Sequence, residues 1–439
     1  MTPSKKRAFR TAGRLEEATG KIAVRELQDS PEDVPYADGR KKGEAGGFTS
    51  TLTSGNTPSK PARACSFLIA AFAVVLIGCV LIPNGMFTPN TASNSLAQWI
   101  ALGAQNISDI CTYILGQGNP NSIGFVVNRY LVLAFAGAAL GMSGAVYQGS
   151  LKNALASPTT LGVMSGATCG ATFYALFFVS NTSEATVSNA SDAIAGMDGL
   201  SFFQYLASIQ GQALSALAGA MIVVTFVVGI AYFAGRGRIS GLALIITGQV
   251  VMGVLGGINT LIRYYMAYTA PDSPQSYAMR YLQNGALDAQ YTVYSVIAIG
   301  IPVLACFLVI MLLRDKVNLL AFGESEAWSM GVNVNRLRFG VVALTTLLTA
   351  VVVSFCGTIG FIGFFVPHLS RRIVGPNFRY LLPASALTGA SFLMLAYFLS
   401  SQIGLAVSSA IGIFTSVIGG IVFIAICVKE RGGGHDGWD

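Results

Sequence analysis

The sequence predicts an all-α, polytopic membrane protein with about ten transmembrane helices. Of the 439 residues, 53% are hydrophobic and only 11% are charged, whereas a soluble domain carries roughly 25% charged residues. The mean hydropathy is +0.61. Apolar runs long enough to cross a bilayer recur from residue 65 to the end of the chain. A soluble hydrophobic core cannot explain this composition.

Ten apolar runs are candidates for the transmembrane helices. In chain order they are Cys65–Ile82, Tyr130–Tyr147, Thr160–Ser180, Ala213–Phe233, Leu242–Ile262, Tyr291–Leu313, Phe339–Cys356, Ile359–Leu369, Leu381–Leu399 and Val407–Val428. The eighth run is short and ends near Pro367, which predicts a broken or tilted helix there.

The chain begins with a polar segment that mixes basic and acidic residues and has few large apolar ones. Such a segment cannot bury enough surface to offset its chain entropy, so we expect it to be disordered. The predicted organisation is a cytoplasmic tail over 1–63, a transmembrane permease domain over 64–430 and a cytoplasmic C-terminal tail over 431–439. The net charge of +7 favours contact with anionic membrane lipid over nucleic acid, because no basic face with interleaved aromatic residues is present.

The Lys and Arg residues beside the apolar runs predict the orientation. They fall at alternate, same-side positions: the N-terminal tail, Lys152, Arg236, Arg238, Arg314, Lys316, Arg336, Arg338, Arg371, Arg372, Arg379, Lys429 and Arg431. The opposite loops Pro83–Asn128, Asn181–Gln212 and Ser401–Ala406 contain no Lys or Arg. Because positive residues are retained on the cytoplasmic side, we expect both termini to be cytoplasmic.

The predicted spans contain no Asp or Glu. Carriers coupled to protons or sodium usually need an ionisable group within the membrane, although backbone carbonyls can also bind sodium. An ion-coupled secondary transporter is therefore disfavoured but stays an alternative. The chain also lacks the phosphate-binding pattern G-x-x-x-x-G-K-[ST]. We therefore expect no enzymatic activity from this chain, and any ATP hydrolysis would occur on separate subunits.

Small residues recur one helical turn apart in two spans, at Gly137 and Gly141 and again at Gly253 and Gly257. Such spacing lets two helix backbones approach closely. We favour ordinary packing between helices over a dedicated dimer face.

Three stretches on the predicted cytoplasmic side carry a more specific signal. They are Gly144–Ala167, Ala321–Arg336 and Gly357–Ala386, the last with the series Gly-Phe-Ile-Gly, Val-Pro-His and Leu-Leu-Pro-Ala-Ser. At these residues the chain resembles the permease family of type II ABC importers for iron-siderophores, haem and cobalamin. The resemblance runs from about the first span to the C-terminus.

The resemblance implies a cobalamin-importer-like bundle of ten helices in the cytoplasmic (inner) membrane of a bacterium. Its expected partners are a second permease subunit, in a homodimer or heterodimer, two ABC ATPase subunits and an extracellular or periplasmic substrate-binding protein. The expected cargo is an iron complex, a siderophore or haem, with cobalamin as the alternative. No cofactor and no bound metal are expected.

The second stretch is too polar to span, yet its apolar residues follow a short amphipathic period: Leu320, Ala321, Ala327, Trp328 and Met330. It predicts surface helices broken at Gly331. In the family the matching Gly-Glu-x-x-Ala-x-x-x-Gly segment docks into a groove of the ATPase. The resemblance therefore implies coupling roles for Glu324, Ala327 and Gly331. The alternative is a solvated connector that only reverses the chain.

The resemblance also implies a translocation path and a gate. Gln249, Gly253 and Asn259 are small or polar positions of the fifth span and are expected to line the path. The gate is expected at Ser240 and Gly241, at the cytoplasmic entry to that span.

External arginines dock the binding protein in the family, which implies this role for Arg129, Arg263 and Arg280. The alternative is that they only anchor helix ends to lipid headgroups. The chain departs from the family pattern at Val126, where the first of two arginines is expected. Docking is therefore expected to rely on fewer charge pairs.

Overall fold

The computed structural model describes residues 60–81, 108, 123–178, 201–237, 239–271, 273 and 293–402, together with 411–412, 414–421 and 423–424. All of them belong to the unit Pro58–Asp439. The expected C-terminal tail and Arg280 lie outside these residues. Of the expected N-terminal tail, only residues 60–63 are described.

The described residues form helices and no strand. The helices are α2 (Lys60–Leu81), α4 (Ile123–Ser150), α5 (Val163–Phe178), α7 (Ser201–Ala234), α8 (Gly241–Thr269), α10 (Val293–Phe322), α11 (Glu324–Ser329), α12 (Val334–Cys356), α13 (Ile362–Val374) and α14 (Phe378–Gln402). Each of the first nine predicted spans coincides with one of them. The tenth, Val407–Val428, lies largely outside the described residues. The all-α membrane fold is confirmed.

Within the described part, seven helices are long and apolar enough to cross a membrane. The shorter α5 and α13 have 16 and 13 residues. The expected surface helices are also present, because α10 continues to Phe322 and the short α11 ends before Gly331.

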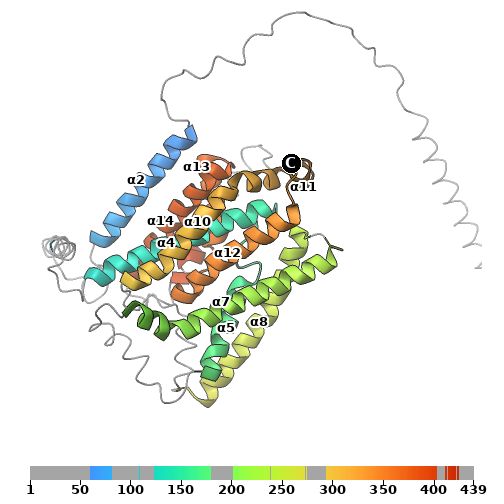
Figure 1. Cartoon of the computed structure of the whole chain (residues 1–439). Coiled ribbons are helices and arrows are strands. Elements are labelled where there is room, and N and C mark those ends of the chain that lie inside the picture. Colours follow the sequence, from blue (N-terminus) through green and yellow to red (C-terminus); the bar gives the residue numbers. More distant parts are fainter. Residues whose placement is uncertain are drawn as a thin grey trace, which may run out of the picture. The chain divides into compact units, whose positions relative to one another are not determined.

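Helix α4 lies at the centre of the bundle (Figure 1). In its apolar window 83% of the residues are buried, compared with 11% in α8. One group of helices, α10, α12, α13 and α14, packs directly around α4, and a second group contains α5, α7 and α8. Because α12 contacts both α4 and α7, it joins the two groups.

Small residues allow α4 to occupy this central position. A Cβ atom at Gly137 would collide with the backbone of Gly389 in α14, and one at Gly144 would collide with Gly363 in α13. A Cβ atom at Gly141 would likewise meet Ser385. The preference for ordinary packing within the chain is therefore confirmed for the first glycine pair.

Gly144→Ala is expected to destabilise the protein by about 1–3 kcal/mol, because overpacking at a backbone contact forces the helices apart. Gly229→Ala in α7 is the matched control, since nothing lies within 4 Å of the added Cβ. This control should be neutral or stabilising by roughly 0.5–1 kcal/mol, as expected for alanine in a helix interior. Thermal unfolding of both purified variants measures the difference, and equal midpoints would contradict the packing argument.

Of the break or tilt expected near Pro367, the break is wrong. Helix α13 continues through Pro367 to Val374, although a proline inside a helix removes one backbone hydrogen bond and its ring crowds the carbonyl of the preceding turn. The chain instead turns between α12 and α13. Gly357 and Phe361 have positive φ values of 74° and 71° there, which ends one helix and reverses the chain before the next.

Candidate coupling site

Helix α11 is a single short element whose end is fixed by Gly331. The Gly331 N–H donates to the Trp328 carbonyl at 2.9 Å, and the Val332 N–H donates to the Ala327 carbonyl at 2.9 Å. With Gly331 at φ +79°, these bonds form a Schellman motif, in which glycine is favoured because the left-handed conformation strains other residues. Gly331 therefore has a local structural role in addition to the expected coupling role.

Helix α11 turns one side toward the bundle and the other outward. Ala327 is fully buried, so its methyl group packs within the chain. Trp328 in α11, Phe322 at the end of α10 and Met330 just after α11 are exposed, with exposed fractions of 77%, 79% and 64%. Three large apolar side chains that lie close together in the sequence are therefore exposed beside this short helix. We call this set the α11 patch.

Two carboxylates accompany the α11 patch. Glu326 is exposed, and hydrogen bonds from its own backbone N–H and from the Ser325 hydroxyl lower the pKa of its carboxyl group. Glu324 instead turns toward the bundle and reaches Arg338 at the start of α12, with 2.7 Å between its Oε1 and the guanidinium nitrogen.

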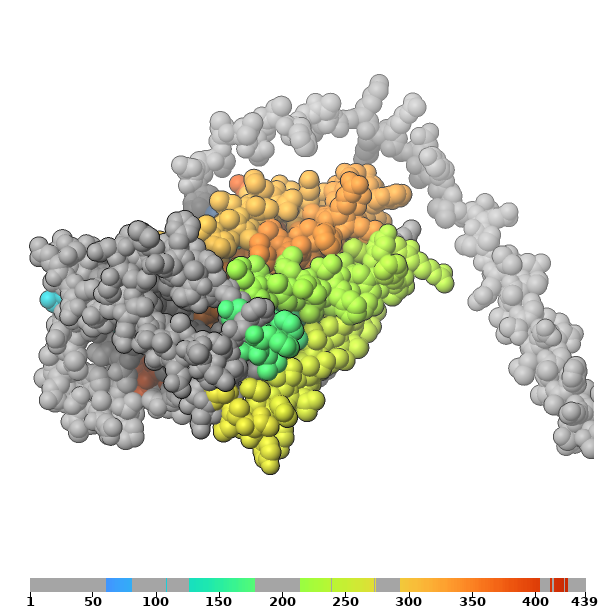
Figure 2. All heavy atoms as spheres, turned by 60° about the horizontal axis from the view of Figure 1, so that its bottom comes forward, coloured from blue at the N-terminus to red at the C-terminus, as the bar shows by residue number. Residues whose placement is uncertain are grey.

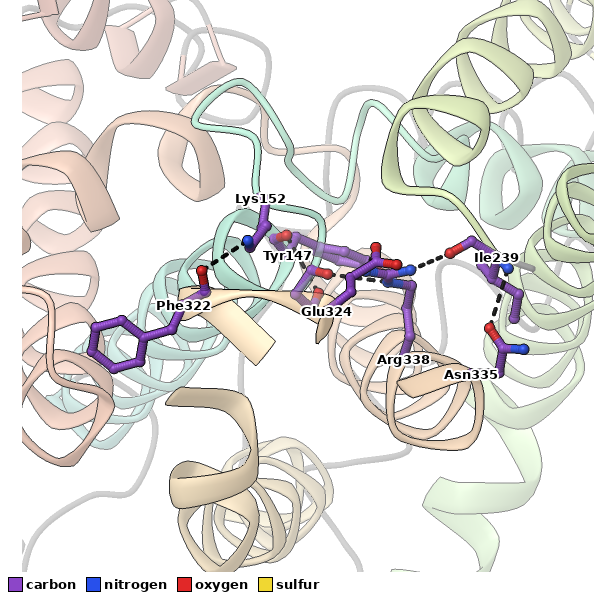
Figure 3. A network of polar contacts seen from close by, with 8 residues as sticks. Tyr147, Lys152, Ile239, Phe322, Glu324, Asn335 and Arg338 are labelled. Carbon is purple, nitrogen blue, oxygen red and sulfur yellow. Dashed lines mark hydrogen bonds and ion pairs between the residues drawn. The ribbon is translucent and has the colours of Figure 1, made fainter. Parts of the chain in front are cut away.

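Arg338 is the centre of a polar junction (Figure 3). Its side chain is only 1% exposed. Besides Glu324, it donates from Nε to the Ser150 carbonyl at 3.1 Å, at the end of α4, and from a second guanidinium nitrogen to the Ile239 carbonyl, just before α8. One planar guanidinium therefore joins three segments that are far apart in the sequence.

The burial of Arg338 makes this junction energetically important. Removing one partner of a buried charge typically costs about 3–5 kcal/mol, because the remaining charge is left uncompensated. The side chain of Glu324 is 54% exposed, so water screens part of its interaction and the Glu324–Arg338 bond contributes less than that. The two backbone carbonyls of Ser150 and Ile239 are the other acceptors of Arg338.

Two further contacts reinforce the junction. Lys152, just after α4, donates from Nζ to the Phe322 carbonyl at 2.9 Å. Asn335 accepts from the Ile239 N–H at 3.2 Å and donates to the Gly237 carbonyl at 3.1 Å. Asn335 and Arg338 are three residues apart on α12 and thus share a face, from which both hold the connection between α7 and α8.

The expected gate residues adjoin this junction. Ser240 is exposed and immediately follows Ile239. Gly241 is buried, and a Cβ atom there would meet the Leu151 backbone after α4. The structure thus brings the expected gate and Glu324 together through Arg338. Sequence reasoning used Arg338 only as a marker of orientation, since its burial has no signal in the local pattern.

The expected path residues lie on two faces of α8. Gln249 and Gly253 are exposed, next to the apolar side chains Val250 and Val254, which are 62% and 58% exposed. Asn259 is buried and donates from Nδ2 to the Thr168 hydroxyl of α5 at 2.9 Å. Figure 2 shows α8, in yellow, beside α7 at the surface.

The expected docking arginines lie at the other end of α4 and α8. Arg129 is partly exposed and donates to the Tyr397 hydroxyl of α14 at 2.7 Å. Its guanidinium carbon is 5.8 Å from the centre of the Tyr397 ring. Arg263 is partly exposed near the end of α8, and Arg280 lies outside the described residues. Arg129 therefore also links two helices.

The described part of the chain contains no group of three or more His, Cys, Asp and Glu residues that could hold a metal ion. The polar junction consists of one arginine, one carboxylate, amide groups and backbone carbonyls. These described residues connect separate segments and contain no nucleophile paired with a base.

A bundle of apolar helices with an exposed short helix tied to its centre is the architecture of a polytopic membrane protein. The sequence matches the model of the FecCD transport family over residues 95–429. The chain belongs to this family. It is therefore a permease, a transport component of an ABC transporter.

Relatives and a solved structure agree with this membership. The chain is 30% identical over 338 residues to the Fe(3+)-citrate import system permease protein YfmE of Bacillus subtilis, covering 75% of this chain and 90% of that one. It is 31% identical over 304 residues to the cobalamin import system permease protein BtuC of Halobacterium salinarum, covering 69% and 72%. A metal-chelate type ABC transporter solved in an inward-facing conformation covers 84% of this chain and 99% of its own, with 24% identity and a TM-score of 0.62. This last likeness supports the fold.

Proposed function

We propose that this permease imports an iron complex, a siderophore or haem, across the cytoplasmic membrane when separate ATPase subunits hydrolyse ATP. The match to the FecCD transport family carries the proposal, and the similarity to a Fe(3+)-citrate import permease supports the cargo. The polar junction supports the drive by separate ATPase subunits, because it connects an exposed short helix to the centre of the bundle and to the start of α8. A permease that is powered by ATPase subunits lying outside the bilayer needs such a connection.

The α11 patch is the proposed contact with the ATPase. Large exposed apolar side chains, tryptophan above all, supply most of the binding energy in protein interfaces. The outward side chains Trp328 and Met330 would enter the partner, while Glu324 and Ala327 face the bundle. Gly331 shapes the end of the helix.

The exposed face of α8 is the proposed boundary of the translocation path, completed by a second permease subunit. Its apolar window is only 11% buried. Large apolar residues alternate there with Gln249 and Gly253. A face of this kind suits contact with another subunit and with a weakly held cargo, and Ser240 and Gly241 are the proposed gate at its entry.

Uptake into proteoliposomes tests the cargo and the energy source. The permease would be reconstituted with an ATPase and a binding protein from the same genome, and radiolabelled ferric siderophore, haem and cobalamin would be compared. We expect uptake of an iron complex that needs internal ATP and resists a protonophore. Uptake of cobalamin alone would favour the alternative cargo, and uptake that is driven by an ion gradient without ATP would favour the secondary transporter.

The proposed orientation places α11 and both termini in the cytoplasm. Cysteines placed singly at Ser325 in α11 and at Ser188, which lies outside the described residues, should react with an impermeant maleimide from opposite sides of the membrane. The loop that contains Ser188 has no Lys or Arg, which favours its export. Labelling of both positions from one side would contradict this topology.

A further inference from the structure

Arg338 is the one Lys, Arg, Asp or Glu side chain that is buried among the residues the structure describes. Buried charges are rare unless they are paired, because desolvation is costly. The preference of basic residues for the cytoplasmic side does not explain why Arg338 is buried. An exposed arginine such as Arg336 would orient the chain equally well. The partners of Arg338 indicate a different role.

The three partners of Arg338 come from segments that a transport cycle would move differently. Glu324 lies on the exposed α11, Ile239 precedes the proposed gate, and Ser150 ends the central α4. The central helix is held on all sides. Arg338 thus bonds to the end of the central helix and to two other segments at once (Figure 3).

We propose that Arg338 is a positioning residue that couples displacement of α11 to displacement of the connection between α7 and α8. When α11 moves, the half-exposed Glu324 carboxylate moves with it and shifts the guanidinium of Arg338. The bond from Arg338 to the Ile239 carbonyl then passes this shift to Ser240 and Gly241. Asn335 holds Gly237 and Ile239 to the same face of α12, so this connection moves with α12 as one piece.

The shape of the arginine side chain fits this role. A guanidinium offers five donors in a rigid plane, so movement of one acceptor reorients the bonds to the other two. Lysine carries the same charge on a shorter, rotating group and cannot hold three acceptors in fixed directions. Arg338→Lys should therefore keep the fold and lose most of the coupling.

This inference rests on the proposed function, and the experiment distinguishes failure of the coupling role from failure of the proposed function. In a background without the seven native cysteines, a cysteine would replace Leu242, which lies in the first turn of α8 and is 63% exposed. Its labelling rate from the cytoplasmic side would be measured in the reconstituted complex with and without ATP plus vanadate. We expect the rate to depend on nucleotide in the parent protein.

The ATPase should stay bound to the Arg338→Lys and Glu324→Gln variants. In both variants the effect of nucleotide on the labelling rate should fall by roughly tenfold, because a charge-assisted hydrogen bond is weakened. The ATP hydrolysed per cargo molecule imported should rise in both variants. Glu324→Gln changes an exposed side chain and is expected to fold normally. Arg336→Lys is the matched control, because Arg336 is exposed on the same helix turn, and it should behave like the parent.

A purely structural role for Arg338 would lower protein yield or thermal stability without changing the ratio of ATP hydrolysed to cargo imported. That result, or a full nucleotide effect in both variants, would overturn the coupling role. A parent protein that imports cargo with ATP but shows no nucleotide effect at residue 242 would also overturn it, while leaving the proposed function intact. Absence of any ATP-driven uptake by the parent would instead reject the proposed function.

Discussion

Gly331→Val is expected to uncouple ATP hydrolysis from uptake, lowering the uptake rate by roughly tenfold or more. Gly331 holds the left-handed conformation at φ +79° and ends α11 through its Schellman motif. A β-branched residue in this conformation is strained by about 1–2 kcal/mol, and a loss of about 1.4 kcal/mol corresponds to a tenfold change in an equilibrium constant. The end of α11 should therefore rearrange and displace the α11 patch. Uptake and ATP hydrolysis would be measured together in proteoliposomes.

Gly331→Asn separates the two roles of this glycine. Asparagine tolerates the left-handed conformation, and nothing lies within 4 Å of a Cβ atom at this position. If Gly331 acts by shaping α11, the asparagine variant should import cargo nearly normally. Loss of uptake in both variants would mean that the ATPase excludes any side chain there, and normal uptake in both would contradict the coupling role of Gly331.

The predicted membrane spans agree well with the helices because long apolar runs are a strong, local signal. The sequence of the Gly-rich second span predicts a helix but not its central position in the bundle. Close packing at Gly144 depends on Gly363, which lies more than two hundred residues later in the chain. The break expected at Pro367 failed for a related reason. The lost hydrogen bond and the crowding by the proline ring cost about 3 kcal/mol, and packing of α13 against α4 offsets this cost.

The candidate site could be predicted in part only. The positions of Glu324 and Gly331 were found through a motif, and the structure gives each a distinct geometry. The sequence pattern could not show that Ala327 is buried while Trp328 is exposed, because a six-residue helix is too short to define a face by periodicity. It also could not reveal Arg338, since burial of a charge depends on acceptors supplied by distant segments.

The proposed coupling helix and the proposed gate therefore meet at one end of the bundle. Glu324, Arg338 and Ile239 form a continuous series of bonds from α11 to the start of α8. Energetic coupling between two sites requires a connected element with alternative arrangements. The half-exposed Glu324 is the contact in this series that is easiest to change, since water can replace its partner.

The opposite end of α4 should determine how fast the binding protein associates. Arg129→Glu is expected to slow this association by about tenfold at low salt, because reversing a rim charge mainly alters electrostatic steering. The difference from the parent should shrink as salt rises and the screening length falls from about 10 Å at 0.1 M to about 3 Å at 1 M. Stopped-flow or surface-binding measurements across a salt titration would record both effects.

Tyr397→Phe provides the control that the geometry requires. Arg129 donates to the Tyr397 hydroxyl, so Arg129→Glu removes a link between α4 and α14 as well as a charge. Tyr397→Phe removes the link and keeps the charge. If docking depends on charge, Tyr397→Phe should associate at the parental rate while its stability falls by about 0.5–1.5 kcal/mol, the usual contribution of one hydrogen bond. An equal loss of association rate in both variants would show that Arg129 orders the helix ends, and an unchanged rate in Arg129→Glu would exclude it as a docking residue. Because Val126 stands where the family resemblance leads us to expect the first of two arginines, the salt dependence should be shallow even in the parent.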